Sequence, residues 1–555
     1  APRLKVMVSS RAALNLYGEH NYPVPPLGLP EKGRRQTVAV LSQYESVALF
    51  IQRAKAAKSD FDITEENAPA IAEICVRLDG LPLAIELAAA RVKVFPPQTM
   101  LDRLSERLKI LTGGARNLPG RQQTLRGTIG WSYDLLDDDE KKLFTRLGVF
   151  SGGWTLEAAE TVCGDALTMD VPTGLESLLS KSLIREMDSL SGATRFTMLG
   201  TIREYAVERL AATSEAEAIG ERHAEFYAAM IESITSWTAE AIRQATDEVD
   251  NVRRAAEWSL AHGRPQIVAR FANTLYYNWA VTAGWREKTG WLEQALAQRE
   301  ALSAPQQSDA TRAIGAIFSY RGQLEQSRHY NSEALQIARA CGYKNGIARC
   351  LNNLANTVND LDHDPALARE TYLEAQAIFR ELGNQHGVAL ISLNLAYLAM
   401  PHDVDGAPAN ATEALNLYAE LNDLPHQSMA CALLMRVEIE AGRFQAAREA
   451  GMTMVRLAED GMIVGKTMVV FNWGLLATAE GDAERAARLL GCALAAWETY
   501  DLPPMEEDYE LRYNRALEAI HAKLDEAAFK AAWDQGRAMG VEEALASVLK
   551  GVDND

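Results

Sequence analysis

The chain has 555 residues, of which 48% are hydrophobic and 24% are charged, and this length indicates several domains rather than one. Charged residues interrupt the long apolar stretches and no signal-peptide pattern is present, so we expect a cytoplasmic protein that does not bind membranes. The six cysteines are scattered without a Cys-x-x-Cys pair, which argues against a disulfide framework and against a zinc site.

The first predicted element is a strand near the start of the chain. Residues 4–8 are apolar except for Lys5 and are followed by two serines and Arg11, a pattern typical of a buried strand. No partner strand precedes it, so we expect the sequence to be a fragment of a longer protein. The Pro-rich stretch 22–30 predicts an extended linker, because proline removes a backbone donor and biases its predecessor away from helix.

Residues 36–122 have the pattern of a helical bundle. The stretch 69–78 places its apolar residues at three- and four-residue spacing, on one helix face, at Ile71, Ile74, Cys75 and Leu78. Gly80 can end this helix and Pro82 can begin the next, which is the usual asymmetry of helix termini.

Residues 123–214 predict a winged helix, with three helices followed by a β-hairpin. Asp137 is a plausible cap for a helix that begins with three acidic residues. The predicted strands are Ser182–Met187 and Arg195–Leu199, joined by the turn-forming residues 188–193.

The remainder of the chain predicts an α-solenoid of tetratricopeptide-like repeats. Residues 215–305 are expected to form a helical linker and the first repeats, 306–500 the main array, and 501–555 a C-terminal helical cap. Turn residues that separate amphipathic stretches recur every 37 to 43 residues, at Gly322, Asp362, Asp405, Gly442 and Gly481. A helix pair of this length cannot bury its own apolar face, so neighbouring pairs are expected to stack around a concave groove.

Motifs that carry catalysis are absent from the sequence. It contains no His-Glu-x-x-His, Gly-x-Ser-x-Gly or Gly-x-Gly-x-x-Gly pattern, and its nine histidines show no ligand-like clustering along the chain. The stretch 461–467 ends in Gly-Lys-Thr, but Asp460 occupies the position where a phosphate loop needs its first glycine. We therefore interpret it as a turn between helices, and expect neither catalytic residues nor a metal.

Several of these segments resemble the NB-ARC-type nucleotide-binding module of bacterial STAND regulatory ATPases. Gly80, Leu81, Pro82 and Leu83 match the family's Gly-Leu-Pro-Leu motif, and the strand ending in Arg11 looks like its sensor strand. Met198, Leu199 and Gly200 stand where relatives carry a Met-His-Asp motif. The last 55 residues resemble the C-terminal cap of the same group.

The resemblance implies that residues 1–35 are the C-terminal remnant of a P-loop NTPase core, in a mainly α chain. In the family, the sensor arginine reads the terminal phosphate and the motif proline packs on the adenine, which assigns these roles to Arg11 and Pro82. The winged helix closes over ADP and swings away with ATP, which permits oligomerisation. Here the P-loop and the metal-binding strand are missing, so ATP or ADP is expected in the parent protein and not tightly on this chain. Leu199 and Gly200 replace the motif's His and Asp.

The resemblance and the repeats together predict the regulatory and sensing portion of a signal-transduction ATPase. Its repeat groove would bind a protein or small-molecule inducer, and the activated protein could form a homo-oligomer. A scaffold without nucleotide control remains an alternative. A DNA-binding winged helix is a second alternative, but the expected recognition helix 174–182 offers only Lys181, and residues 131–555 hold 38 Lys/Arg against 63 Asp/Glu. We therefore expect no direct nucleic-acid binding.

Overall fold

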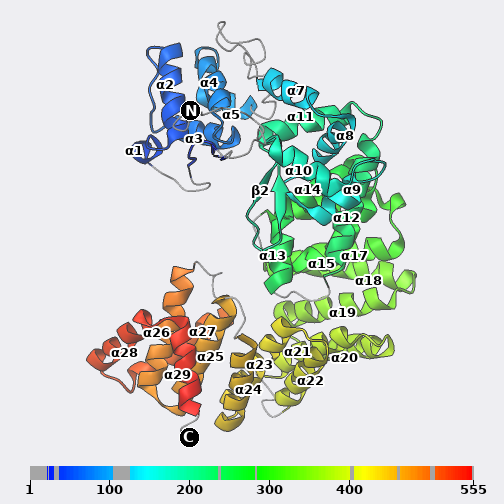
Figure 1. Cartoon of the computed structure of the whole chain (residues 1–555). Coiled ribbons are helices and arrows are strands. Elements are labelled where there is room, and N and C mark those ends of the chain that lie inside the picture. The colour runs from blue at the N-terminus through cyan, green and yellow to red at the C-terminus, as the bar shows by residue number, and fades with distance from the viewer. Residues whose placement is uncertain are drawn as a thin grey trace. The chain divides into compact units, whose positions relative to one another are not determined.

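The computed structural model describes residues 20, 22, 24–30, 37–103, 125–234, 239–281, 284–400, 406–458, 463–500 and 507–552. These residues are mainly helical, and their strands form one small sheet (Figure 1). They divide into two compact units: unit 1 contains the described residues up to 230 together with 244–262, and unit 2 contains 231–243 and those from 263 onward. None of the described helices is long and apolar enough to span a bilayer. The predicted strand ending in Arg11 lies outside the described residues.

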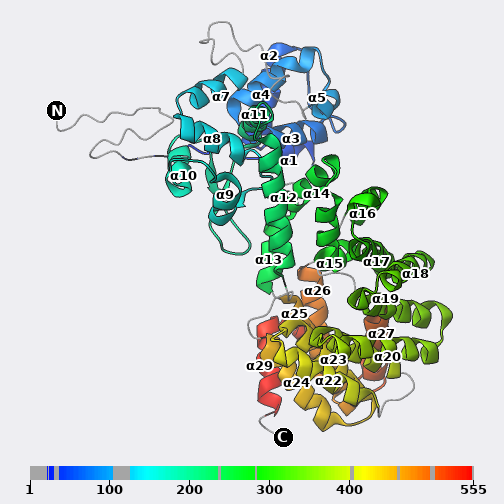
Figure 2. The same cartoon turned by 90° about the vertical axis from the view of Figure 1, so that its right-hand side faces the viewer.

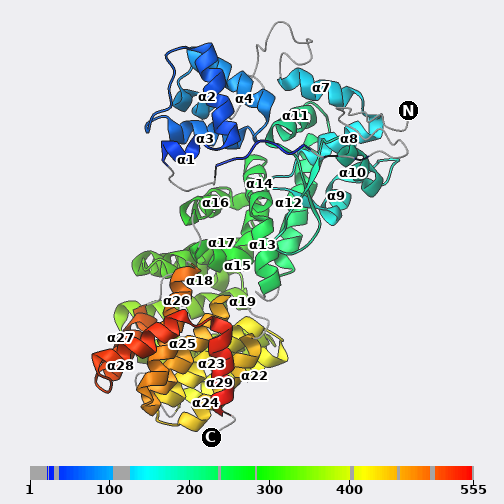
Figure 3. The same cartoon turned by 60° about the vertical axis from the view of Figure 1, so that its left-hand side comes forward.

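Unit 1 begins with a helical bundle in which α2 packs against α3 and α4 (Figure 3), and α5 packs against α3. Its elements are α1 (Val38–Leu41), α2 (Glu45–Ala57), α3 (Ala68–Arg77), α4 (Pro82–Ala89), η1 (Ala90–Lys93) and α5 (Pro97–Arg103). The predicted apolar face of α3 is confirmed, because Ile71, Ile74 and Cys75 are fully buried. Phe50 of α2 is also fully buried and contacts Phe61, with 6.3 Å between the ring centroids.

The winged helix follows in the same unit. Its elements are α7 (Leu125–Asp134), α8 (Asp138–Leu147), β1 (Trp154–Thr155), α9 (Leu156–Cys163), α10 (Val171–Ser180), β2 (Arg185–Met187), β3 (Arg195–Thr197) and α11 (Gly200–Ala211). The strands form an antiparallel sheet in the order β1-β3-β2. The predicted cap is confirmed, since Asp137 accepts from the Glu140 amide in a capping box.

The sequence predicts three helices before the hairpin, and the structure has four. The additional element is α9, which has only eight residues and directly follows the two-residue strand β1. Thr155 caps α9 by accepting from the Ala158 amide, so one short segment changes from strand to helix within two residues. Periodicity is a weak signal over so short a helix.

Helices α12 (Ala216–Glu232), α13 (Ala239–Asp247) and α14 (Val249–Ala261) follow the winged helix. An aromatic cluster joins α12 to the winged helix within unit 1. The Phe150 ring stacks on Trp154 at a centroid distance of 5.4 Å, and it contacts His223 of α12 at 5.4 Å and Tyr227 at 6.4 Å. Phe150, His223 and Tyr227 are at most 1% exposed, so this contact belongs to the core.

Unit 2 is a series of stacked helix pairs that follow one another along an arc (Figure 1). Its elements up to residue 381 are α15 (Pro265–Val281), α16 (Trp285–Ala297), η4 (Arg299–Ala301), α17 (Ala304–Tyr320), α18 (Leu324–Ala340), α19 (Lys344–Thr357), the π-helix η5 (Val358–Asp362) and α20 (Pro365–Glu381). The later elements are α21 (Gln385–Ala399), α22 (Ala407–Glu420), α23 (Leu424–Glu440), α24 (Phe444–Ala458), α25 (Ile463–Glu480), α26 (Ala483–Thr499), α27 (Glu507–His521), α28 (Glu526–Ala538) and α29 (Val541–Val552).

Four of the five turn residues predicted from the sequence fall between two successive described helices. Gly322, Gly442 and Gly481 have φ angles of 70°, 71° and 88°, which only glycine adopts without strain, and each separates two helices. Asp362 ends η5 between α19 and α20, whereas Asp405 lies outside the described residues. The interpretation of 461–467 as a turn needs a correction, because Gly465, Lys466 and Thr467 belong to the start of α25.

The cores of unit 2 run through successive helix pairs. Around Trp473 of α25, which is 2% exposed, apolar residues of α23, α24, α26, α28 and α29 form one cluster. Helix α29, coloured red, lies against α25 in Figures 1 and 2. The C-terminal helices therefore cover the apolar face of the last pair, as a capping segment of a solenoid must.

Candidate functional site

The Gly-Leu-Pro-Leu motif forms the turn between α3 and α4. Asp79 and Gly80 have φ angles of 55° and 64°, and the Gly80 carbonyl accepts a 3.0 Å hydrogen bond from the Leu27 amide. A Cβ atom at Gly80 would lie 2.4 Å from the Leu27 carbonyl oxygen, so the position requires glycine. Pro82 is exposed at the first turn of α4, while Leu81 and Leu83 are half-buried beside it.

The structure brings this turn to the position of the family's Met-His-Asp motif. Met198 is buried, Leu199 is the N-cap residue of α11, and Gly200 is its first residue. The Gly200 amide donates a 2.8 Å hydrogen bond to Oδ2 of Asp79. A carboxylate is a favourable partner for the first amides of a helix, so Asp79 satisfies a donor that Leu199 cannot cap. Arg11, the remaining predicted site residue, lies outside the described residues.

The wing is the hairpin of β2 and β3, and its tip is the turn between them. Asp247, the last residue of α13, binds this tip. Its carboxylate accepts hydrogen bonds from the amides of Leu190 and Ser191, at 3.0 and 3.1 Å, and from the hydroxyls of Ser189 and Ser191, at 2.9 and 2.8 Å. Burial opposes ionisation, but these hydrogen bonds outweigh it and hold the pKa of Asp247 below its ordinary value. The described polar groups at the tip of the wing therefore find their partner within the protein.

The base of the wing is held by a buried ion pair. Arg195 of β3 pairs with Glu248, and the two side chains are 2% and 4% exposed. Nη2 of Arg195 also donates to the Asp247 carbonyl at 3.1 Å. Because a buried charge without its partner is costly, this pair fixes β3 against the junction of α13 and α14.

Asn251 extends the same network to α12. Nδ2 of Asn251 donates to the Gly153 carbonyl at 2.8 Å and to the Glu248 carboxylate at 2.7 Å. Oδ1 of Asn251 accepts from the Ser151 amide at 2.8 Å. His223 Nε2 lies 3.3 Å from that oxygen and must therefore donate to it. His223 is thus a neutral, buried ring, and burial lowers its pKa to about 3.

The expected recognition helix is α10, and its only cation is engaged. Lys181, the C-cap residue of α10, forms an ion pair with Glu140 of α8 and lies 3.0 Å from the Ser177 hydroxyl. The exposed residues of α10 are Pro172, Thr173, Glu176 and Ser180. This face contains one carboxylate and no cation, which is unsuited to phosphates or guanine edges.

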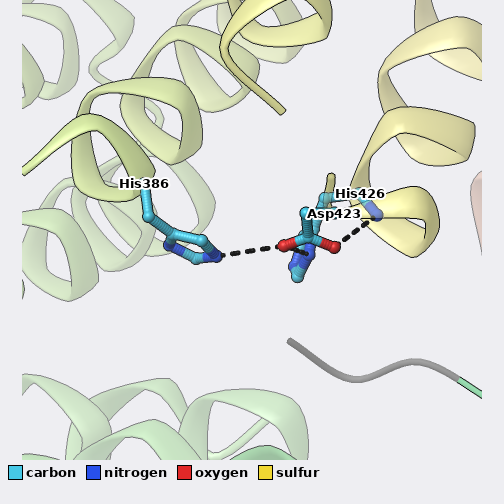
Figure 4. A group of neighbouring side chains, drawn as sticks. All are labelled: His386, Asp423 and His426. Carbon is cyan, nitrogen blue, oxygen red and sulfur yellow. Dashed lines mark hydrogen bonds and ion pairs between the residues drawn. The ribbon is translucent and has the colours of Figure 1, made fainter. Parts of the chain in front are cut away.

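A second site lies in the repeats, where His386, Asp423 and His426 form a cluster (Figure 4). Asp423 caps α23 by accepting from the His426 amide at 3.3 Å. Its Oδ2 lies 2.8 Å from Nδ1 of His426 and 3.4 Å from Nε2 of His386, the second residue of α21. Burial raises the pKa of this carboxyl, but the two imidazoles outweigh burial and hold it well below the ordinary value.

This cluster corrects the sequence-based statement that the histidines do not gather. His386 and His426 are 40 residues apart, which equals one repeat period, so each lies near the start of the first helix of its pair. The repeat period was the signal that could have found them. Asp79, Asp247 and Glu248 were also missed, and no sequence pattern links them to partners more than fifty residues away.

A depression also lies among α16, α17 and α18 of the repeats. It is shallow, with a volume of about 360 Å³, and its lining includes Glu293, Glu333, Arg299 and Tyr330. This is at the N-terminal edge of the segment predicted to bind an inducer. Ligand binding by the groove stays a prediction.

Two family models match parts of the chain. The winged helix-turn-helix domain model matches residues 136–211, and the tetratricopeptide repeat model matches residues 306–381. The fold therefore defines a helical protein that contains a winged helix-turn-helix domain and tetratricopeptide repeats.

Curated relatives come from mycobacteria. The chain is 36% identical over 301 residues to the protein named Putative HTH-type transcriptional regulator Rv0890c of Mycobacterium tuberculosis, a match that covers 53% of the chain and 32% of the relative. It is 35% identical over 225 residues to the Uncharacterized protein Rv0894 of the same organism, covering 40% of the chain and 54% of the relative. The match thus spans about a third of the first relative and about half of the second.

Solved structures share less sequence with the chain. A signal transduction ATPase with numerous domains (STAND) protein with a tetratricopeptide repeat sensor, from Pyrococcus horikoshii, is 14% identical, with a TM-score of 0.40 over 89% of this chain and 74% of that chain. A Rap protein complexed with competence and sporulation factor is also 14% identical, with a TM-score of 0.41 over 60% of this chain and 100% of that chain. TM-scores this low do not establish a shared overall arrangement.

Proposed function

We propose that this chain is the regulatory and sensing portion of a signal-transduction ATPase that controls transcription. The winged helix acts as a joint in this proposal. One observation carries it: the Gly200 amide at the start of α11 donates to Asp79 beside the Gly-Leu-Pro-Leu turn. Two segments that resemble nucleotide-contacting motifs thus meet through a hydrogen bond, although they are 121 residues apart in the chain.

The contacts of the wing support a joint rather than a DNA reader. Asp247 holds the wing tip and Glu248 holds Arg195 at its base. The winged helix therefore contacts the helical bundle through α11. Through its sheet it contacts the junction of α13 and α14. A change in the position of α11 would reach α14 through these contacts, since Arg195 and Glu248 are both buried and cannot separate without a large cost. The relatives named as transcriptional regulators support the regulatory role.

Nucleotide control in this proposal needs a phosphate-binding segment in addition to the residues of this sequence. The printed sequence contains no phosphate loop, and most of the binding energy in such sites comes from the phosphates and the metal. We therefore expect calorimetry with ATP or ADP to give no binding at micromolar nucleotide. The repeats would bind the inducer, which the match of residues 306–381 to a tetratricopeptide repeat supports.

The joint is tested by substituting Asp79 in the full chain. Asp79→Gly removes the acceptor but tolerates the φ angle of 55°, whereas Asp79→Asn keeps an oxygen that can accept. We expect hydrogen exchange of the Gly200 amide to rise about tenfold or more in Asp79→Gly, since hydrogen bonds to charged groups contribute about 1.5–3 kcal/mol. Asp79→Asn should change it much less.

An unchanged Gly200 amide in Asp79→Gly would show that Asp79 does not hold α11, and the joint would have to be abandoned. The remaining candidate would then be a repeat-based scaffold without nucleotide control. That alternative is favoured by Leu199 and Gly200, which lack the imidazole and carboxylate of the family's motif.

A further inference from the structure

Three potential ligand atoms from two successive repeats converge at the His386–Asp423–His426 cluster. They are Nε2 of His386, Oδ2 of Asp423 and Nδ1 of His426, and all lie within 4.8 Å of one another. Figure 4 shows the Asp423 carboxylate pointing toward His386, which lies on α21. His426 lies in the first turn of α23, the helix that Asp423 caps. Among the described residues, no other group of three such side chains meets this condition.

The two separations that involve Asp423 suit a small tetrahedral ion. An ion with bonds of about 2.1 Å keeps its ligand atoms about 3.4 Å apart. The distance between His386 and Asp423 is already 3.4 Å, and the 2.8 Å distance between His426 and Asp423 needs to open by a fraction of an ångström. Rotation of the His426 side chain, which is 24% exposed, can supply this change.

The surroundings orient the ligands and leave an entry path. The buried Tyr418 ring stacks on His426 at a centroid distance of 4.9 Å and meets His386 edge-on at 5.6 Å. Asp423 is 2% exposed, so its charge is not dispersed by water, whereas His386 is 43% exposed. An ion can therefore reach the site from solvent and keep a water as its fourth ligand.

We propose that His386, Asp423 and His426 bind one divalent transition-metal ion of the zinc class, which links α21 to α23. Two imidazole nitrogens and one carboxylate are ligands that such ions prefer. On binding, His426 carries its proton on Nε2 and His386 carries its proton on Nδ1, so each neutral ring offers a lone pair to the ion. The ion replaces the hydrogen bonds to Asp423 and stiffens the contact between two repeats. This proposal replaces the sequence-based expectation of a chain without metal.

The test uses Co²⁺ as a spectroscopic probe on the full chain freed of metal with a chelator. We expect one equivalent of Co²⁺ to give the visible absorption bands of a tetrahedral site, and Zn²⁺ to displace it. His386→Ala and Asp423→Asn should each weaken Co²⁺ binding by at least about 100-fold, more than changes to groups that only support a ligand. Asn remains a good N-cap, so Asp423→Asn leaves α23 capped.

His329→Ala is the matched control, because His329 is an exposed histidine of α18 outside the cluster. It should bind Co²⁺ as the unchanged chain does. Circular dichroism of each metal-free variant verifies that it is folded. If the unchanged chain gives no tetrahedral spectrum, or if His386→Ala and Asp423→Asn keep the full spectrum, the site does not bind metal and the cluster serves only as a hydrogen-bonded helix cap.

Discussion

Single residues in the core of unit 1 couple its folding to pH. His223 is 1% exposed and uses Nε2–H to donate to Asn251, so protonation would place a positive charge in the buried core. Arg203 of α11 and Arg254 of α14 add electrostatic repulsion to the cost of burial, and the pKa falls to about 3 from an ordinary value of 6.5.

We expect this histidine to destabilise the fold as the solution is acidified. Between pH 6.5 and about 3 the unfolded chain takes up the proton and the folded chain does not. The free energy of unfolding therefore falls as pH is lowered through this window, by up to about 1.4 kcal/mol per pH unit from this group. Denaturant unfolding of the full chain at pH 7 and pH 5 measures the slope.

His223→Gln should be less stable at pH 7, since it disturbs a packed core, but its stability should change less between the two pH values. His329→Gln, at an exposed position, should keep the slope of the unchanged chain. Equal slopes for His223→Gln and the unchanged chain would show that His223 is not the group responsible.

At the scale of elements, the wing is a strand pair stabilised by a helix junction. The two-residue and three-residue strands of this sheet are too short to be stable alone. Four hydrogen bonds from residues 189–191 to Asp247, and the pairing of Arg195 with Glu248, provide the missing stabilisation.

Removing the Asp247 carboxylate should release the wing tip. In Asp247→Ala we expect the amides of Leu190 and Ser191 to exchange at least about tenfold faster, because hydrogen bonds to a charged group contribute about 1.5–3 kcal/mol. Cleavage within residues 188–193 by a nonspecific protease should also accelerate. Asp250→Ala is the control, since Asp250 is half-exposed and pairs with Arg253 of its own helix. Unaltered exchange in Asp247→Ala would contradict the role given to this residue.

Cap and turn residues made most elements predictable from the sequence. The tertiary partners of individual residues could not be predicted in this way. Asp137 and the glycines Gly322, Gly442 and Gly481 act on their immediate neighbours, so the sequence predicts the helix ends that they set. The pairs that build the candidate sites join Gly200 to Asp79 and Arg195 to Glu248, across 121 and 53 residues. Such pairs depend on how elements pack, and a single sequence carries no signal for them apart from the 40-residue spacing of the two clustered histidines.

For the whole molecule, the charge distribution bears on nucleic-acid binding. The net charge is −19, and a protein gains affinity for DNA mainly by neutralising phosphates and releasing their counterions. The described recognition helix α10 adds no compensating cationic face, since Lys181 pairs with Glu140 and the exposed residues of α10 include Glu176 but no cation. The wing, which could otherwise follow a groove, is tied to Asp247.

We therefore expect the full chain not to bind duplex DNA at physiological salt. Fluorescence anisotropy with a labelled random duplex should stay at its baseline up to about 10 μM protein. Non-specific DNA-binding proteins have dissociation constants of about 1–100 μM, so many of them would already bind at this concentration. Because no phosphate contacts are expected, lowering the salt to about 50 mM should produce little binding, and Lys181→Ala should behave as the unchanged chain does. A complex that survives physiological salt and competitor DNA, and is lost in Lys181→Ala, would instead identify α10 as a recognition helix whose pairing with Glu140 is broken on the DNA.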